Sequence, residues 1–152
     1  MKNLTTEENK MHTQKVIFGK SKDVAGKVIR LFTWSNYNHV ALLDETEKFV
    51  IEATAHNGVQ RVSVENFKSR YAKWEIATIP SRVPTNEVLL GALAEIRLPY
   101  DWWGVFGLVL RKRLQYPSKW FCSELVAAKT HLYRQQGRIT PQHIFNISAV
   151  KS

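Results

Sequence analysis

The sequence contains one cysteine, few acidic residues and no long apolar run among its 152 residues. Because Cys122 is the only thiol, an internal disulfide and a structural zinc site with several thiolates are excluded. The longest apolar stretch, residues 102–110, has nine residues, whereas a membrane-spanning helix needs about twenty. The first ten residues are polar and contain no apolar signal core, so we expect a cytoplasmic protein unless another route delivers it.

Acidic side chains are outnumbered, since 13 Asp and Glu face 22 Lys and Arg, which gives a formal net charge of +9 at pH 7. This excess favours an anionic partner. The one tight cluster, Arg111, Lys112 and Arg113, predicts contact with an anionic surface such as a membrane or a cell-wall polymer. The other basic residues are scattered, as on a solvated face, and that interpretation of the charge is favoured. No pattern of a known nucleic-acid fold is present, so no specific nucleic acid is expected.

The length and the 44% hydrophobic content predict a single domain over residues 15–152, preceded by a loose tail over residues 1–14. Short β-rich runs alternate with turn residues in the first half, and apolar stripes at helical spacing dominate the second. This order predicts an α+β fold with mostly antiparallel strands followed by helices. The expected strands are 15–19, 39–43, 49–53, 59–64 and 74–79; the expected helices are 24–33, 85–98, 101–113 and 121–136.

Cys122 lies in the first turn of the helix predicted over 121–136, directly after the break at Pro117 and Ser118. A thiol attacks as the thiolate, and the free N–H groups and dipole of a helix N-terminus favour that negative charge. A lone cysteine is more often a small buried core residue, so a catalytic interpretation also requires a base. His131 is on the same helix, about 13 Å along it, and is too far away.

His39 and Glu52 supply a base and a carboxylate on neighbouring predicted strands. If residues 44–47 form a four-residue hairpin loop, Leu43 pairs with Lys48, and counting outward brings His39 opposite Glu52 on one face. An imidazole beside a carboxylate is the base and orienting group of a catalytic triad. The alternative is a surface His–Glu pair on a solvated sheet face.

With these three residues assembled, the chain resembles the papain-like hydrolases of the NlpC type. In that superfamily the cysteine begins a helix within a C-S-x-L-V motif, and residues 122–126 read C-S-E-L-V. Residues 99–104, P-Y-D-W-W-G, are similar to the upstream Y-x-W-G pattern, with one extra residue between Tyr100 and Gly104. The family tyrosine lies in the active site, so the resemblance gives Tyr100 that role.

The order of the residues identifies a particular branch of this superfamily. Ordinary members run cysteine, histidine, polar residue, whereas this chain runs His39, Glu52, Cys122. That order is similar to the circularly permuted YiiX/YebB-like proteins, in which a W-S-x-Y-x-H segment precedes the strand. Residues 33–39, T-W-S-N-Y-N-H, match it, and V-I-E-A over 50–53 matches the glutamate strand.

The resemblance implies a permuted papain-like fold, a small antiparallel sheet or half-barrel packed against helices. It implies a cysteine hydrolase that cleaves amide bonds of peptides, amino-acid amides or cell-wall peptides through an acyl-enzyme on Cys122. His39 would act as the base and Glu52 as its orienting group, Tyr100 would assist the oxyanion, and Tyr37 would line the pocket. No cofactor or metal is implied.

Two other functions stay open at this point. Lipid acyl transfer or thioester chemistry occurs on the same fold, and residues 102–110 followed by the basic cluster could rest on an anionic membrane. A basic nucleic-acid-binding module without catalysis would use Trp102, Trp103 and the basic cluster, although aromatic residues here are typical of a core.

Overall fold

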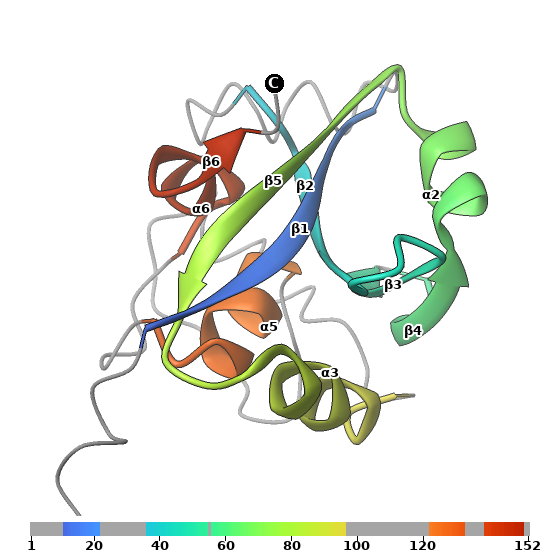
Figure 1. The fold of residues 1–152 in the computed structure, drawn as a ribbon. Helices are drawn as coiled ribbons and strands as arrows, with labels where there is room; N and C mark the ends of the chain where they lie inside the picture. The colour runs from blue at the N-terminus through green and yellow to red at the C-terminus, as the bar shows by residue number, and fades with distance from the viewer. Residues whose placement is uncertain (1–10, 22–35, 55, 97–121, 133–138, 151–152) are drawn as a thin grey trace, which may run out of the picture.

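The computed structural model describes residues 11–21, 36–54, 56–96, 122–132 and 139–150 (Figure 1). These residues form a six-stranded antiparallel sheet with the strand order β4-β3-β2-β1-β5-β6. The strands are β1 (His12–Lys20), β2 (His39–Leu43), β3 (Phe49–Thr54), β4 (Gly58–Ser63), β5 (Lys73–Ser81) and β6 (Ala149–Val150). The described helices are α2 (Val64–Arg70), α3 (Thr85–Leu93), α5 (Cys122–Lys129) and α6 (Pro141–Asn146).

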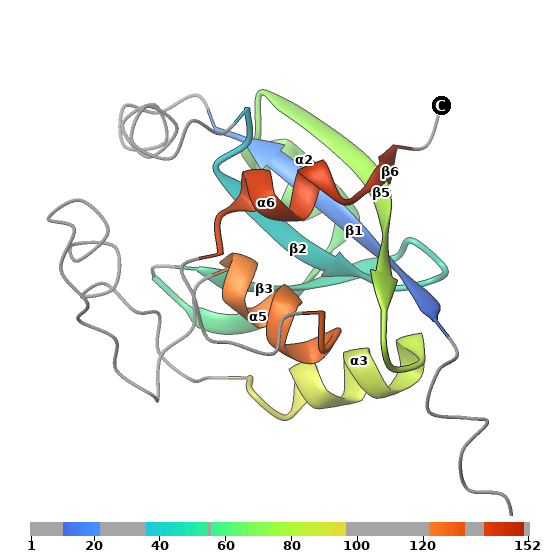
Figure 2. The same ribbon diagram turned by 90° about the vertical axis from the view of Figure 1, so that its left-hand side faces the viewer.

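Helices cover both faces of the sheet, and β2 is buried along its whole length. Val40 and Leu42 of this strand belong to the larger core, in which α3, α5 and α6 pack on one face. Ala41 and Leu43 point the other way, into a smaller core completed by Phe67 of α2. Figure 2 shows α5 and α6 in front of the sheet and α2 behind it. A continuous apolar strand is what burial on both faces requires.

The five predicted strands are all present; β2 has the predicted ends, and the ends of the other four differ from the prediction by at most three residues. β1 begins at His12, so part of the predicted tail belongs to a strand. β5 continues through Pro80, which was expected to end it, because Pro80 pairs with Thr13 in the ladder with β1. The two-residue β6 was missed, because a pair of residues after a helix carries no alternation to detect.

Two of the predicted helices have different ends. The helix predicted over 85–98 ends at Leu93, and the hydroxyl of its first residue, Thr85, donates to the backbone oxygen of Thr13 at 3.0 Å. The helix predicted over 121–136 ends at Lys129, and the hydroxyl of Thr130 turns back to donate to the carbonyl of Val126 at 2.8 Å. The predicted helices over 24–33 and 101–113 lie outside the described residues.

The register of the β2–β3 hairpin was predicted wrongly. Leu43 pairs with Val50 and not with Lys48, because the turn is longer than four residues. The carboxylate of Asp44 accepts the backbone N–H groups of Thr46, Lys48 and Phe49, at 3.0, 2.8 and 2.8 Å, and so holds the longer turn together. Such a two-residue shift leaves every side chain on its predicted face of the sheet, whereas a one-residue slip would not.

Candidate active site

His39 is the first residue of β2, and its ring lies at the end of that strand beside Glu52 of β3. The corrected register makes the two residues diagonal neighbours on the α2 face rather than direct cross-strand partners. His39 Nε2 is nevertheless 2.8 Å from Glu52 Oε2, so the predicted contact forms. The longer reach of a glutamate side chain closes the diagonal.

Glu52 is fully buried, with 0% of its surface exposed, and its two oxygens have different partners. Oε2 faces the ring of His39, while Oε1 accepts hydrogen bonds from Gln60 Nε2 at 2.9 Å and from Arg70 Nη2 at 2.5 Å. Burial raises the pKa of Glu52, but the hydrogen bond and charge of His39, together with Arg70, outweigh it and hold this pKa below its ordinary value. The carboxyl group is therefore ionised at neutral pH.

Cys122 begins α5, which packs on β2 and β3, and only 5% of its surface is exposed. Its thiol lies close enough to His39 to contribute to the pKa shift of the imidazole. Burial lowers the pKa of His39, but the charge and hydrogen bond of Cys122, followed by those of Glu52, raise it to about 10. Because Nε2 faces Glu52, Nδ1 is the ring nitrogen left for the thiol. The ring therefore stands between two groups that can each carry a negative charge.

Aromatic rings fix the plane of the imidazole. Tyr71 follows α2 and stacks on His39, with ring centroids 5.6 Å apart and planes 12° from parallel. Phe67 lies on the same side, with its centroid 5.8 Å from that of His39. Tyr71 in turn covers Gly19, where a Cβ atom would lie only 2.7 Å from the tyrosine ring. Position 19 opposes His39 in the β1–β2 ladder, so the absence of a side chain there makes room for the stacked ring.

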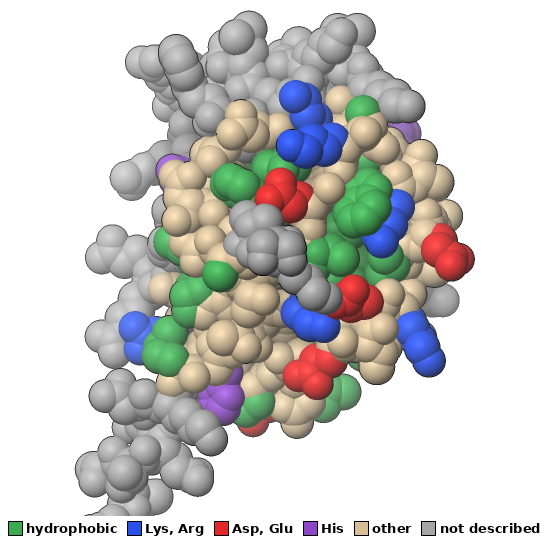
Figure 3. Space-filling model, turned by 45° about the horizontal axis from the view of Figure 1, so that its top comes forward, with side chains coloured by type: hydrophobic (Ala, Val, Ile, Leu, Met, Phe, Trp, Pro, Cys, Tyr) green, Lys and Arg blue, Asp and Glu red, His purple; other side chains and the backbone are tan. Residues whose placement is uncertain are grey.

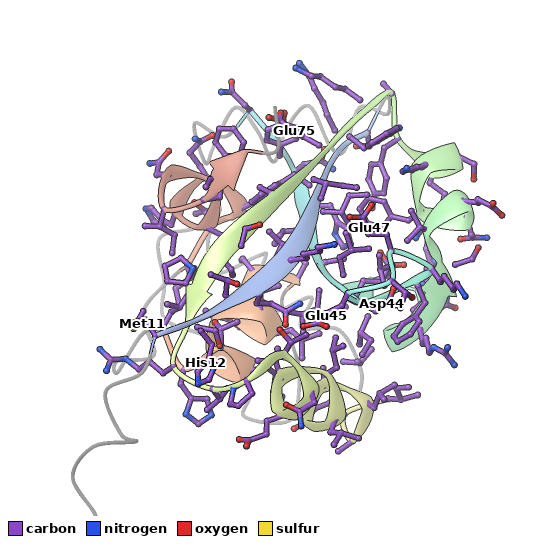
Figure 4. The ribbon with its side chains drawn as sticks, in the orientation of Figure 1. Met11, His12, Asp44, Glu45, Glu47 and Glu75 are labelled. Atoms are coloured by element: carbon purple, nitrogen blue, oxygen red, sulfur yellow. The ribbon has the colours of Figure 1, made fainter. Side chains whose placement is uncertain are left out.

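Tyr37, predicted to line the pocket, is buried in an aromatic cluster with Phe18 and Phe145, whose ring centroids lie 5.4 and 5.1 Å from its own. Its hydroxyl donates to Glu75 of β5, which Figure 4 labels near the upper end of the sheet. Burial, followed by the hydrogen bond and the charge of Glu75, raises the pKa of this hydroxyl. A pocket role for Tyr37 stays a prediction.

Other predicted residues fall outside what the structure describes. Tyr100 and the basic cluster of Arg111, Lys112 and Arg113 are among them, so their roles stay predictions. On the face shown in Figure 3, the Lys and Arg side chains of described residues are scattered among acidic and hydrophobic ones. Among the described helices, none is long and apolar enough to cross a membrane.

A groove at the far end of β2 is separate from this site. Its lining includes Met11, His12, Asp44 and Glu45, which Figure 4 labels, together with Leu89 of α3. Asp44 and Glu45 follow the last residue of β2, whereas His39 is its first. The groove therefore does not reach the His39–Glu52 pair.

The contribution of α2 to the site was missed from the sequence, since residues 65–71 were not among the predicted helices. Phe67 and Arg70 lie three residues apart, on one face of α2, and Tyr71 follows as the C-cap of this helix. That spacing was visible in the sequence, but nothing local shows that the face covers a buried carboxylate. Gln60 carried no signal either, because it is one polar residue on an alternating strand.

Comparison with known families bears on this arrangement of cysteine, histidine and glutamate. Residues 10–149 match the model of the permuted papain-like amidase enzymes of the YaeF/YiiX type, the C92 family. The chain belongs to this family. Its α+β fold, with an antiparallel sheet packed against helices, is the permuted papain-like fold that the sequence predicted.

A solved structure supports the same fold. The crystal structure of YiiX from Escherichia coli O157:H7, described as a metalloprotein, is similar with a TM-score of 0.66 at 16% sequence identity. The similarity covers 93% of this chain and 96% of that one. No curated protein is detectably similar to the chain in sequence.

The residues described in this C92 family member do not fit a metal centre. Within the described ranges, no group of three or more His, Cys, Asp and Glu side chains is arranged to hold a metal ion. The carboxylate nearest to His39 is already occupied, because Glu52 Oε1 takes two donors, one of them a cation. A guanidinium at that oxygen stands where a metal ion would be repelled.

Proposed function

We propose that this C92 family member hydrolyses amide bonds through an acyl-enzyme formed on Cys122, with His39 as general base and acid. The contact between His39 Nε2 and Glu52 Oε2 at 2.8 Å carries the proposal. It leaves Nδ1 for the thiol and fixes which ring nitrogen exchanges the proton. The influence of Cys122 on the pKa of His39 supports the same pairing. Family membership supports the reaction class.

The first half of the reaction transfers the acyl group to sulfur. The Cys122 proton moves to His39 Nδ1, and the thiolate attacks the carbonyl carbon of the amide to give a tetrahedral intermediate. The backbone N–H of Cys122 donates to the developing oxyanion, assisted by Tyr100. The C–N bond then breaks, His39 gives its proton to the departing amine, and a thioester remains on Cys122.

The second half releases the acid. Water occupies the place of the amine, His39 removes one of its protons, and the resulting hydroxide attacks the thioester carbon. The C–S bond breaks, the carboxylic acid leaves, and the thiolate and imidazolium are restored. Throughout both halves Glu52 stays ionised and stabilises the imidazolium, as a buried acceptor-only group does. The substrates we propose are peptides and amino-acid amides, including cell-wall peptides.

Alkylation of Cys122 by iodoacetamide tests the activated thiol without knowledge of the substrate. An ordinary thiol, with a pKa near 8.5, is only about 3% ionised at pH 7. We expect Cys122 in the wild-type chain to react at pH 6 to 7 at least tenfold faster than in His39→Ala. His56→Ala is the matched control, because His56 is exposed in the β3–β4 turn. Equal rates in wild type and His39→Ala would contradict the proposal.

Mass spectrometry of the intact protein mixed with p-nitrophenyl acetate then tests the covalent intermediate. The wild-type chain should gain one acetyl group on Cys122 and lose it again over time. Cys122→Ser should not gain it at neutral pH, and an acetyl group located elsewhere in the wild-type chain would refute the assignment.

A further inference from the structure

Arg70 lies at the end of α2 and is the one charged residue, among those described, that contacts Glu52 besides His39. Its Nη2 is 2.5 Å from Glu52 Oε1, whereas His39 occupies Oε2. The guanidinium therefore binds the oxygen that the imidazole does not use. This division fixes both oxygens of the carboxylate, one by the imidazole and the other by the guanidinium.

The guanidinium is itself held in place by the rings that orient His39. Its central carbon lies 5.5 Å from the ring centroid of Phe67 and 5.6 Å from that of Tyr71. Arginine stacks well on such rings and keeps its charge at all relevant pH values. Phe67 and Arg70 of α2, together with Tyr71 directly after it, thus place two rings beside the imidazole and a cation beside its carboxylate.

The second donor on Oε1 is neutral. Gln60 Nε2 of β4 is 2.9 Å from that oxygen and can orient it, but it adds no charge. Within the described ranges, the titratable or charged groups that face the His39–Glu52 pair are Cys122 of α5, Arg70 of α2 and Tyr71, whose ring stacks on the imidazole. Of these, Arg70 alone brings a permanent positive charge.

We propose that Arg70 is a positioning residue, which keeps Glu52 ionised, aims Oε2 at His39 Nε2 and sets the pH range in which the thiolate–imidazolium pair forms. This inference rests on the proposed function. The charge of the Arg70 guanidinium has two effects. The guanidinium stabilises the carboxylate that orients the ring, and as a fixed positive charge beyond Glu52 and His39 it also favours the thiolate over the thiol. Removing it should move thiolate formation to higher pH.

The size of that shift follows from distance and exposure. Arg70 is 34% exposed at its side chain, so water screens part of its charge. The carboxylate of Glu52 and the ring of His39 lie between the guanidinium and the thiol. A unit charge on the order of 10 Å away, at an effective dielectric constant of about 40, changes a protonation equilibrium by roughly 0.5 pH unit. We therefore expect the lower limb of the Cys122 alkylation profile to rise by roughly 0.5 pH unit in Arg70→Gln.

The experiment compares iodoacetamide alkylation rates from pH 4 to 10 in wild type, Arg70→Gln and Arg70→Lys. Lysine keeps the charge, so Arg70→Lys should restore most of the wild-type profile. Arg61→Gln is the matched control, because Arg61 lies on β4 over the Phe49 ring, 4.0 Å from its centroid, and does not contact Glu52. Arg70→Met keeps the stem against Phe67 and Tyr71 and replaces Arg70→Gln if that variant does not fold.

The outcomes separate this inference from the proposed function. A profile unchanged in Arg70→Gln but altered in His39→Ala overturns the role of Arg70 and leaves the hydrolase proposal standing. A fall in thermal stability with no movement of the profile shows a merely structural role and also overturns it. A wild-type thiol that titrates as an ordinary cysteine contradicts the proposed function itself.

Discussion

Replacing Glu52 with glutamine should inactivate the site because the amide cannot satisfy both sets of partners. The carboxylate accepts from His39 on one oxygen and from Gln60 and Arg70 on the other. A glutamine has one acceptor oxygen and one NH₂ group. If the NH₂ group faces His39, Nε2 must become an acceptor, and the proton moves to Nδ1, where it blocks transfer from the thiol. If it faces the other side, two donors lose their acceptor.

Both arrangements carry a free-energy cost that the structure allows us to bound. Each buried donor left without a partner costs about 1–3 kcal/mol. Arg70 is partly exposed and can be hydrated, which reduces the total. We expect Glu52→Gln to lose about 2–3 kcal/mol of unfolding free energy at pH 7, or roughly 5–10 °C in melting temperature. The wrong tautomer should lower hydrolysis about 10²–10⁴-fold.

The pH dependence of this loss provides a sharper check. The pKa of Glu52 is held below its ordinary value of 4.5, so its charge stabilises the folded state above that pH. The stabilisation is lost as pH falls through the lower pKa of the folded state. The pKa of His39 is raised, so the charged ring contributes fully below pH 6.5 and less as pH rises through about 10. The difference in unfolding free energy between wild type and Glu52→Gln should thus be largest between about pH 4.5 and 6.5, where both charges contribute fully.

Urea unfolding, followed by circular dichroism from pH 3 to 10.5, measures that difference. Wild type and Glu52→Gln should approach each other at both ends of the range. A difference that stays constant with pH would refute the reasoning, because a merely steric defect does not titrate.

Three further substitutions have distinct expected results. Gly19→Ala places a Cβ against the Tyr71 ring, so it should cost about 1–3 kcal/mol of unfolding free energy and slow Cys122 alkylation. The control Gly91→Ala meets its nearest neighbour at 3.5 Å and should be neutral or stabilising. Equal effects of the two substitutions in thermal melts would refute the close approach at Gly19. Asp44→Asn weakens the acceptor of three backbone N–H groups and should lower the unfolding free energy. Because these hydrogen bonds hold the pKa of Asp44 low, the loss measured by urea unfolding should shrink as pH falls below about 4. The rate of Cys122 alkylation should not change. Tyr37→Phe keeps the aromatic packing but removes the hydrogen bond to the Glu75 carboxylate, so it should cost about 1 kcal/mol of unfolding free energy and leave Cys122 alkylation unchanged. Lower hydrolysis at unchanged stability would instead place the hydroxyl at the substrate.

Short β-rich runs bounded by turn residues predicted the strands well, both where burial alternates, as at the end of β4, and where both faces are buried, as in β2. The helices were harder, since their ends depend on tertiary contacts. The helix that begins at Cys122 ends at Lys129, although its apolar pattern continues beyond that residue. The helix predicted over 85–98 ends at Leu93, and the hydroxyl of Thr85 at its start bonds to a strand that is distant in the sequence.

The candidate site shows the same division. The contact between His39 and Glu52 was predicted with the wrong register, and it survived because a shift of two residues preserves the face of a strand. The length of the turn depends on the hydrogen bonds of Asp44, which a count of loop residues does not include.

The sequence by itself determined the residue types and their order: one thiol at a helix start, and a histidine and a glutamate on neighbouring strands before it. The residue types and their order follow from local patterns, which can be recognised without knowledge of the fold. Only the tertiary structure decided that α2 packs over the pair and brings Arg70 to the oxygen of Glu52 that His39 does not contact. Charge compensation in a buried site depends on which distant elements meet, and no local spacing encodes that meeting.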